Sequence, residues 1–416
     1  MTARSQIDFV QKNARWLAGG FLLTLFSSFG QTFFIGLFGN DLRATFDLTA
    51  GEFGGLYMLA TLASAASLPW LGRTLDLMPG WKVVGFTMPA LALACALMGS
   101  VHGFVGLLLA LFMLRLFGQG MMSEIAFTEI GRWFSANRGR AIALVMPGFQ
   151  IGNAFLPMAV VWLSSLFDWR AVWWVSAAVV AGIGFPLIVA LLRVERTPES
   201  SGTGGAVPAK SRDWTRAEVL RDPLLYVLLA GVLAPPFIGT TIFFHQGYLV
   251  ALRGYDPVVF ASAFPVTAAT TIGFGFVCGH LIDRFGAIRV LPFFLLPLAC
   301  ASFAVGLVTP DWGIYLFMLL LGISNGFSQT LVGALWPEVY GTANLGGIRA
   351  ITVSAIVLST ALGPGITGGL IDLGIGLPVQ MLWMGAWCLV ATLGLAIASR
   401  KIGQRNALFG LSSEAS

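Results

Sequence analysis

The sequence predicts an all-α integral membrane protein with twelve transmembrane helices, in two six-helix halves that repeat one another. The first observation is composition: 57% of the 416 residues are apolar and 10% are charged, whereas a soluble globular protein carries roughly 25% charged residues. The second is that the apolar residues gather in twelve stretches, each long enough for the ~20 residues that cross ~30 Å of hydrocarbon. The third is that short patterns in the first half recur in the second.

The apolar stretches are continuous and do not alternate with polar residues, so they predict helices and not the strands of a membrane barrel. The first stretch, Trp16 to Gly39, is too long for the apolar core of a signal peptide, and we expect it to be the first span. The twelve stretches are centred near Ser28, Ser64, Leu91, Leu114, Ile151, Val180, Pro236, Thr270, Leu298, Ser324, Leu358 and Val390.

Lysine and arginine residues predict the orientation of the spans. Every second loop, both termini and the long middle segment are rich in them, whereas the opposite loops contain only Arg43, Arg170 and Arg253. Basic loops stay on the cytoplasmic side, so both termini are expected there. This pattern explains the net charge of +5, and nucleic acid is not expected as a partner. We expect a monomeric multi-pass protein in the lipid bilayer of the plasma membrane, namely the inner membrane of a bacterium.

The longest polar stretch, Glu195 to Asp222, predicts a linker between the halves. Residues 200–205 have the Ser/Gly composition of a flexible chain. Trp214 to Leu220 is expected to form a short surface helix, with Thr215 and Glu218 as its capping box. Asp222 and Pro223 have the residue types of an N-cap and a first helical position for the seventh span. The predicted parts are residues 1–193, 194–222 and 223–416.

Two short patterns recur at about half the chain length. Gly72-x-x-x-Asp76 follows the second span, and Gly279-x-x-x-Asp283 follows the eighth, 207 residues later. Arg140-Ala-Ile at the start of the fifth span recurs 209 residues later as Arg349-Ala-Ile. Two parallel six-helix repeats with a substrate between them are a known plan of secondary transporters.

The loop after the eighth span resembles the signature of the major facilitator superfamily. It reads Gly279-His-Leu-Ile-Asp283-Arg284-Phe-Gly286, whereas the first copy, from Gly72 to Lys82, lacks the arginine after its aspartate. The resemblance implies the major facilitator fold and a loop that latches the cytoplasmic side closed. The gating and conformational residues it implies are Gly72, Asp76, Gly279, Asp283, Arg284, Arg132 and Arg140.

Physical chemistry is compatible with that latch. The glycines would allow close helix approach, and each carboxylate could accept hydrogen bonds from a helix N-terminus or from a cation such as Arg132 or Arg349. The alternative is that Asp76 and Asp283 are ordinary solvated loop charges.

A second resemblance covers Arg132 to Ala143 and continues to Gly148, Gly152 and Pro157. This run is similar to bacterial monocarboxylate-porter-like members of the same superfamily. The drug-antiporter signature, Gly-Pro-x-x-Gly-Gly, is absent from the fifth span, although a near relative occurs at 363–369 in the eleventh. The resemblance therefore favours a small organic anion over a drug.

Arg115 is the clearest ionisable residue inside a span. Such groups are costly in a membrane and usually face a cavity. Gln119 and Met122 follow Arg115 at helical spacing, which predicts a polar stripe, whereas Glu124 would face another side. Arg115 either binds substrate or pairs with another helix. Glu124 is a candidate for proton coupling, with helix packing or loop contacts as the alternative.

Other polar residues fall in spans one, seven and ten, which by resemblance line the transport cavity with span four. His245 could titrate near neutral pH and couple a proton, or it could simply bond a carbonyl near the outer end of its helix. Helix breakers at 235–236 and 363–365 could bend spans seven and eleven. The remaining candidate substrate contacts are Gln31, Gln246, Asn325 and Gln329.

These observations favour a secondary transporter that moves a small organic anion, such as a monocarboxylate, by alternating access with a co-transported proton. No metal, nucleotide or haem motif occurs, and the four cysteines lack ligand spacing, so no cofactor and no enzyme activity are expected. A drug or amphiphile exporter would tolerate loss of Arg115. A non-transporting sensor would bind ligand without flux. A membrane-embedded enzyme would need clustered His or paired carboxylates within its spans.

Overall fold

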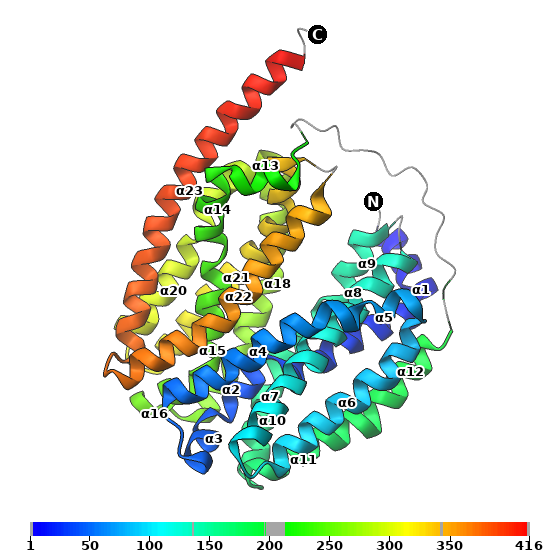
Figure 1. The fold of residues 1–416 in the computed structure, drawn as a ribbon, viewed down its shortest axis with the longest axis vertical. Helices are drawn as coiled ribbons and strands as arrows, with labels where there is room; N and C mark the ends of the chain where they lie inside the picture. Colours follow the sequence, from blue (N-terminus) through cyan, green and yellow to red (C-terminus); the bar gives the residue numbers. More distant parts are fainter. Residues whose placement is uncertain (1–2, 135–136, 195, 197–212, 342–343, 414–416) are drawn as a thin grey trace. The chain divides into compact units, whose positions relative to one another are not determined.

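The computed structural model describes residues 3–134, 137–194, 196, 213–341 and 344–413, and within these ranges its regular elements are all helices (Figure 1). The contacts divide the chain into two compact units. The first comprises Met1–Gly204 with Gln246–Tyr248, and the second comprises Gly205–His245 with Leu249–Ser416.

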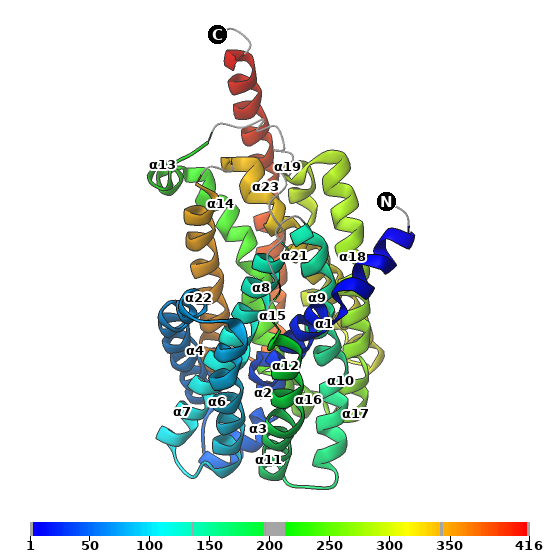
Figure 2. The ribbon, with the colours of Figure 1, turned by 90° about the vertical axis from the view of Figure 1, so that its right-hand side faces the viewer.

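The first unit holds six predicted spans, several of which are built from more than one helical segment. Its helices are α1 (Ala3–Phe26), α2 (Thr32–Leu37), α3 (Gly39–Phe46), α4 (Ala50–Gly72), α5 (Thr74–Leu77), α6 (Gly80–Ser100), α7 (Phe104–Met113), α8 (Met122–Trp133), α9 (Arg138–Val145), α10 (Pro147–Ser164), α11 (Trp169–Val179) and α12 (Phe185–Leu192). The α6 and α11 helices lie side by side (Figure 2).

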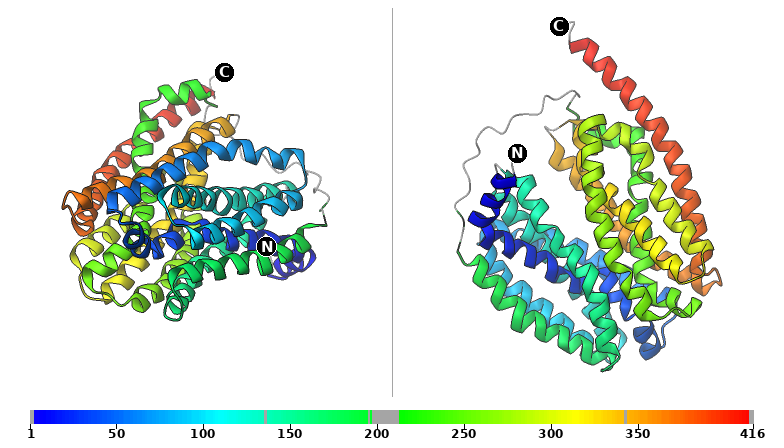
Figure 3. Two further views of the ribbon diagram at one scale, coloured as in Figure 1. Left: turned by 60° about the horizontal axis from the view of Figure 1, so that its bottom comes forward. Right: turned by 180° about the vertical axis from the view of Figure 1, so that it is seen from behind.

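The second unit has the linker helix and the other six spans. Its helices are α13 (Arg216–Arg221), α14 (Pro223–Val232), α15 (Ala234–Phe244), α16 (Gln246–Arg253, which belongs to this unit from Leu249 on), α17 (Pro257–Ser262), α18 (Phe264–Phe285), α19 (Ala287–Val290), α20 (Leu296–Leu307), α21 (Trp312–Tyr340), α22 (Leu345–Asp372) and α23 (Leu377–Ser413). The α18 and α21 helices form its most extensive helix pair, which is seen from behind in Figure 3.

Eleven helical segments of the described chain are long and apolar enough to cross a membrane. The predicted second span is the exception. It forms the 23-residue helix α4, but its Gly, Ser, Thr and Tyr residues lower its mean hydropathy. Each predicted span is thus helical, in one segment or more, and the all-α membrane fold class is confirmed.

The predicted linker helix is present as α13. Thr215 accepts from the backbone of Glu218, and the Glu218 carboxylate accepts in return from the backbone of Thr215, which confirms the capping box. Asp222 caps α14, and Pro223 is its first residue, as predicted. The predicted flexible segment 200–205 lies outside the described residues.

Asp222 also anchors the end of α23 to the rest of the second unit. Its Oδ2 atom lies 2.7 Å from Nη1 of Arg405 and accepts a hydrogen bond from the Tyr340 hydroxyl at 3.1 Å. The Arg405 guanidinium stacks on the Trp214 ring at 4.5 Å. The ion pair joins the start of the seventh span to the C-terminal helix, and its contacts with Tyr340 and Trp214 add the tenth span and the linker.

We expect Arg405→Ala to destabilise the protein by about 3 kcal/mol, because it leaves the Asp222 carboxylate, 6% exposed, without its cation. Thermal unfolding of the purified protein measures this effect. The matched control is Arg400→Ala, which removes an exposed arginine from the same helix. Equal shifts of the unfolding temperature in the two variants would show that the buried pair adds nothing.

The predicted helix breakers coincide with a break in span seven but not in span eleven. Pro235 and Pro236 lie where α14 gives way to α15, as predicted, because proline cannot supply the amide that a continuous helix needs. By contrast, α22 runs unbroken through Pro364 from Leu345 to Asp372, so the predicted bend does not interrupt span eleven.

Candidate substrate-binding site

The first span is interrupted in its apolar middle, and the interruption leaves a carbonyl group available. After α1 the chain makes a 3-10 turn over Ser27–Gly30, and Gln31 is extended. The amide of Phe34 then bonds Gln31 and not Gly30. The Gly30 carbonyl oxygen therefore lacks the amide partner that a continuous α-helix would provide.

The fourth span is also irregular, because its helix widens into a π-helical segment over Leu114–Met121. Such segments insert an extra residue into a turn and often occur at functional sites. Arg115 and Gln119 both lie in this segment. The predicted stripe of Arg115, Gln119 and Met122 assumed α-helical spacing, and that assumption is wrong here because the turn is wider.

Two glycines bring these irregular segments into direct backbone contact. A Cβ atom on Gly118 would lie 2.6 Å from the Gly30 Cα atom, and one on Gly30 would lie 2.7 Å from the Gly118 Cα atom. Real side chains cannot approach backbone so closely, so only glycine fits at either position. This crossing places the start of the π-helical segment, and with it Arg115, against the break in span one.

Arg115 is buried in the first unit, with 3% of its surface exposed. Its Nη1 atom donates to the Gly30 carbonyl at 3.3 Å and to the Thr32 hydroxyl at 3.4 Å, and both distances are long for such bonds. Among the described residues it forms no ion pair, and its Nε donor is buried without a partner. Nε lies on the Nε/Nη2 edge, the edge through which arginine binds a carboxylate by two parallel hydrogen bonds, and this donor is therefore available.

Tyr57, from α4, completes the surroundings of the guanidinium. The Cζ atom of Arg115 lies 5.2 Å from the Tyr57 ring centre, and the Tyr57 hydroxyl is 2.6 Å from the Thr32 hydroxyl. A cation over an aromatic ring is stabilised without a counter-charge. Sequence reasoning missed Tyr57, Thr32 and Gly30. A phenol within an otherwise apolar span was the available signal for Tyr57.

The other candidates in the first unit lie near this centre or on its chain segments. Gln119 is half-buried, and its Oε1 atom has no partner among the described residues. Gln31 is half-buried at the break itself. Glu124 is exposed and accepts a hydrogen bond from Thr128, within its own helix, at 3.3 Å. Their roles in binding or proton coupling stay predictions.

The candidates of the seventh and tenth spans are placed as follows. His245, buried at the end of α15, has Nε2 3.0 Å from the Pro364 carbonyl oxygen, which matches the structural alternative for this residue. Gln246 clusters with the first unit and donates to the Phe33 carbonyl at 2.6 Å. Asn325 is half-buried and Gln329 is exposed on α21. Substrate contact by these residues stays a prediction.

The first signature loop is tied to the end of α8 by Arg132. Its guanidinium donates to the Leu75 carbonyl at 3.0 Å, to Glu129 at 3.2 Å and to Asp76 at 3.4 Å. Asp76 is 74% exposed, and Arg132 is 41% exposed. In the second loop, Asp283 is exposed and makes no ion pair with a described residue, while Arg284 lies over the Phe285 ring. Arg140 lies over the Phe9 ring.

A pair of repeated carboxylates was missed by sequence reasoning. Glu129 is buried against Gly80, the first residue of α6, and Glu338, 209 residues later, accepts from the amides of Ala287 and Ile288 at 2.6 and 3.2 Å. Each carboxylate thus faces the N-terminus of a helix, where negative charge is favoured. Glu129 and Glu338 are 209 residues apart, as are Arg140 and Arg349, and this shared spacing could have identified the two glutamates from the sequence.

The signature glycines are not at a close helix approach in this structure, and their role in the latch stays a prediction. A Cβ atom on Gly72 would meet nothing nearer than Glu124 at 3.9 Å, and one on Gly279 nothing nearer than Thr330 at 4.0 Å. Both are ordinary contact distances. Close helix approach in this structure therefore does not require glycine at either position.

We expect Asp76→Asn to shift the balance between conformations by less than about 1 kcal/mol, because its pair with Arg132 is exposed. Glu129→Gln should shift it more, because Glu129 is buried. Transport rates and crosslinking between the ends of the two halves measure the effect. If Asp76→Asn changes both the transport rate and the crosslinking more than Glu129→Gln does, the exposed aspartate contributes more to the latch than the buried glutamate.

The sequence profile of the Major Facilitator Superfamily matches residues 20–364, and the chain belongs to this family. The solved structure of the nucleoside transporter NupG has the same fold, with a TM-score of 0.71 at 11% identity, covering 92% of this chain and 98% of that one. The protein is therefore a multi-pass membrane transporter of the secondary type.

Characterised relatives are distant and differ in their cargo. An agnestins efflux protein of Paecilomyces divaricatus is 24% identical over 61% of this chain, and the match spans 57% of that relative's length. The oxalate:formate antiporter of Oxalobacter formigenes is 23% identical over 79% of each chain. The maltose permease of Geobacillus stearothermophilus is 25% identical over 83% of each chain.

Proposed function

We propose that this protein transports a small carboxylate by alternating access, and that Arg115 binds the carboxylate group. The observation that carries the proposal is the Nε/Nη2 edge of a buried guanidinium, on which the Nε donor has no partner among the described residues, while Nη1 donates to neutral oxygen atoms. A carboxylate supplies two acceptors and one negative charge, which match this edge in geometry and sign. Thr32 accepts a hydrogen bond from Nη1, and the Tyr57 ring lies against the guanidinium, so both residues help to hold it in place.

The relatives support a transporter without deciding its substrate. The similarity to an oxalate:formate antiporter agrees with an anionic substrate. However, a maltose permease is as similar to this chain, and maltose is a neutral sugar, so sequence identity at this level does not identify the substrate. The assignment to a carboxylate therefore rests on Arg115.

The test is uptake of radiolabelled carboxylates into proteoliposomes that contain the purified protein, with and without a pH gradient. Formate, acetate, lactate and oxalate cover small monoacids and one diacid, and maltose is the neutral comparison. Uptake of at least one carboxylate, and none of maltose, is the expected result. Uptake of maltose alone would overturn the proposal.

A drug or amphiphile exporter is the second candidate, favoured by the similarity to an agnestins efflux protein. It predicts that transport survives the loss of Arg115, because an apolar substrate gains nothing from the guanidinium.

We propose Glu124 and His245 as the groups that couple a proton. A pH gradient that leaves carboxylate uptake unchanged would exclude such coupling.

We propose that both termini and the linker lie in the cytoplasm of a bacterial cell, because lysine and arginine gather in the corresponding loops. Single cysteines at Gly205 and Arg253, in a background without the four native cysteines, should react with impermeant reagents from opposite faces of the membrane. Reaction of both from one face would show that this topology is wrong.

A further inference from the structure

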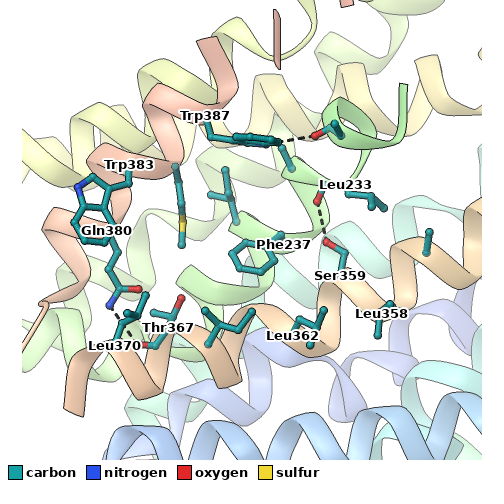
Figure 4. Close-up of a pocket in the computed structure, with 16 residues that line it drawn as sticks. Leu233, Phe237, Leu358, Ser359, Leu362, Thr367, Leu370, Gln380, Trp383 and Trp387 are labelled. Atoms are coloured by element: carbon teal, nitrogen blue, oxygen red, sulfur yellow. Dashed lines mark hydrogen bonds between the residues drawn. The ribbon is translucent and has the colours of Figure 1, made fainter. Parts of the chain in front are cut away.

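A cavity of about 540 Å³ lies within the second unit, among α14, α15, α22 and α23 (Figure 4). Its volume is typical of sites that bind small organic molecules. The break between α14 and α15 contributes to its wall. There the Ser359 hydroxyl donates to the Leu233 carbonyl at 2.9 Å, and the Trp387 indole donates to the Ala230 carbonyl at 3.4 Å.

The cavity opens through apolar side chains that belong to membrane spans. Leu358, Ile366, Trp383 and Trp387 line it and are each about half exposed, at 47%, 48%, 54% and 51%. No ionisable side chain is among its lining residues. In a bilayer an opening of this composition meets hydrocarbon, so its occupant comes from the membrane and is itself largely apolar.

One end of the cavity is polar and has unused acceptors. Gln380, 1% exposed, donates through Nε2 to the carbonyls of Thr367 and Ile375 at 3.2 and 2.7 Å, as the dashed lines in Figure 4 show in part. The Oε1 atom of Gln380 and the Oγ1 atom of Thr367 are both buried without a partner. A buried acceptor that lacks a donor is costly, and a ligand that brings a donor would relieve this cost.

The polar end lies close to the connection between the two helices that form it. Thr367 is five residues from the end of α22 at Asp372, and Gln380 is three residues from the start of α23 at Leu377. From Thr367 the lining continues along α22 to Ala355, which corresponds to ~18 Å of helix. The cavity thus has its polar end near the membrane interface and its apolar length directed into the hydrocarbon.

We infer that this cavity binds one acyl chain of a membrane phospholipid whose head group donates hydrogen bonds. The primary ammonium of phosphatidylethanolamine fits, because it offers three donors to the oxygen atoms of Gln380 and Thr367. The acyl chain then fills the space between α15, α22 and α23, where the lining side chains would otherwise lack dispersion contacts. This site is separate from Arg115 and does not depend on which substrate the protein transports.

The experiment uses the full chain in vesicles of phosphatidylethanolamine and phosphatidylglycerol that contain a phosphatidylethanolamine with a photoreactive acyl chain. Irradiation and peptide mapping should place the label on cavity residues of α22 and α23. Ala355→Phe fills the cavity and should reduce this labelling to background. The control, Ala386→Phe, adds the same side chain at an exposed position of α23 outside the cavity and should leave it unchanged.

Thr367→Val tests the head group without changing side-chain size. In competition between unlabelled ethanolamine and choline lipids, the native protein should prefer ethanolamine, and the variant should lose about fivefold of that preference, as expected for one hydrogen bond. Even labelling of all exposed helices, or equal labelling in the two phenylalanine variants, would overturn the inference. Displacement of the label by a transported substrate would also overturn it, because the cavity would then be a transport site.

Discussion

Arg115→Gln should weaken carboxylate transport at least about 100-fold, because it removes two charge-assisted hydrogen bonds to the substrate. Glutamine is neutral and cannot offer two parallel donors from one edge. The protein should still fold, since the hydrogen bonds of Arg115 to Gly30 and Thr32 are long and go to neutral oxygen atoms. Removing an arginine from within a span also removes an insertion cost of ~2.5 kcal/mol or more. Initial rates of uptake over a range of carboxylate concentrations measure the change.

Arg115→Lys separates the role of charge from that of geometry. Lysine keeps the positive charge but presents it as a point, so it cannot reproduce a bidentate contact or the stacking on Tyr57. Weakened but detectable transport is expected. A carboxylate should also raise the unfolding temperature of the native protein, and this stabilisation should vanish in Arg115→Gln, since only a bound ligand stabilises the folded state.

The matched control for these variants is Arg170→Gln. Arg170 also bonds a backbone carbonyl, that of Val101 at 2.6 Å, and also lies over an aromatic ring, that of Trp169 at 4.5 Å. It sits at the start of a span and is not assigned to the substrate. Normal expression of Arg115→Gln with an unchanged KM for the native substrate would end the carboxylate proposal and favour an amphiphile exporter.

The sequence was sufficient for the fold class because hydropathy and helix caps are local properties. Continuous apolar stretches identify helices in a membrane, where every backbone polar group must be satisfied within the segment. The pair Thr215 and Glu218, and the pair Asp222 and Pro223, marked helix starts for the same reason. Arg115 was found because a charge among apolar residues is conspicuous.

The surroundings of Arg115 could not be predicted, because they depend on how distant segments meet. Spacing rules assume α-helical turns, and they fail within the π-helical segment at Leu114–Met121. Nothing local to Tyr57 or Thr32 indicates contact with a residue two or three spans away. Gly30 and Gly118 are two of 51 glycines, and only the structure shows that these two touch.

Gly118→Ala should disturb the site without touching the guanidinium. The new methyl group would lie 2.6 Å from the Gly30 Cα atom and 2.8 Å from its nitrogen, and no rotamer change can move backbone atoms aside. Span four must therefore shift away from span one. Overpacking of this kind typically costs 1–3 kcal/mol, so about 2 kcal/mol of stability should be lost. The shift also lengthens the contact of Arg115 with Gly30, already 3.3 Å, so carboxylate uptake should fall about tenfold or more, because displacement of about 1 Å can cost more than that.

Gly85→Ala is the control, because a Cβ atom there meets nothing within 4 Å and the position lies inside α6 of the same unit. It should leave uptake unchanged and stabilise the helix slightly, by up to ~1 kcal/mol, since alanine is the better helix former. Unfolding temperature and carboxylate uptake are measured for both variants. If Gly118→Ala behaves like Gly85→Ala in both, spans one and four do not meet as closely as the structure shows. The crossing of Gly30 and Gly118 would then not be what positions Arg115 for the substrate.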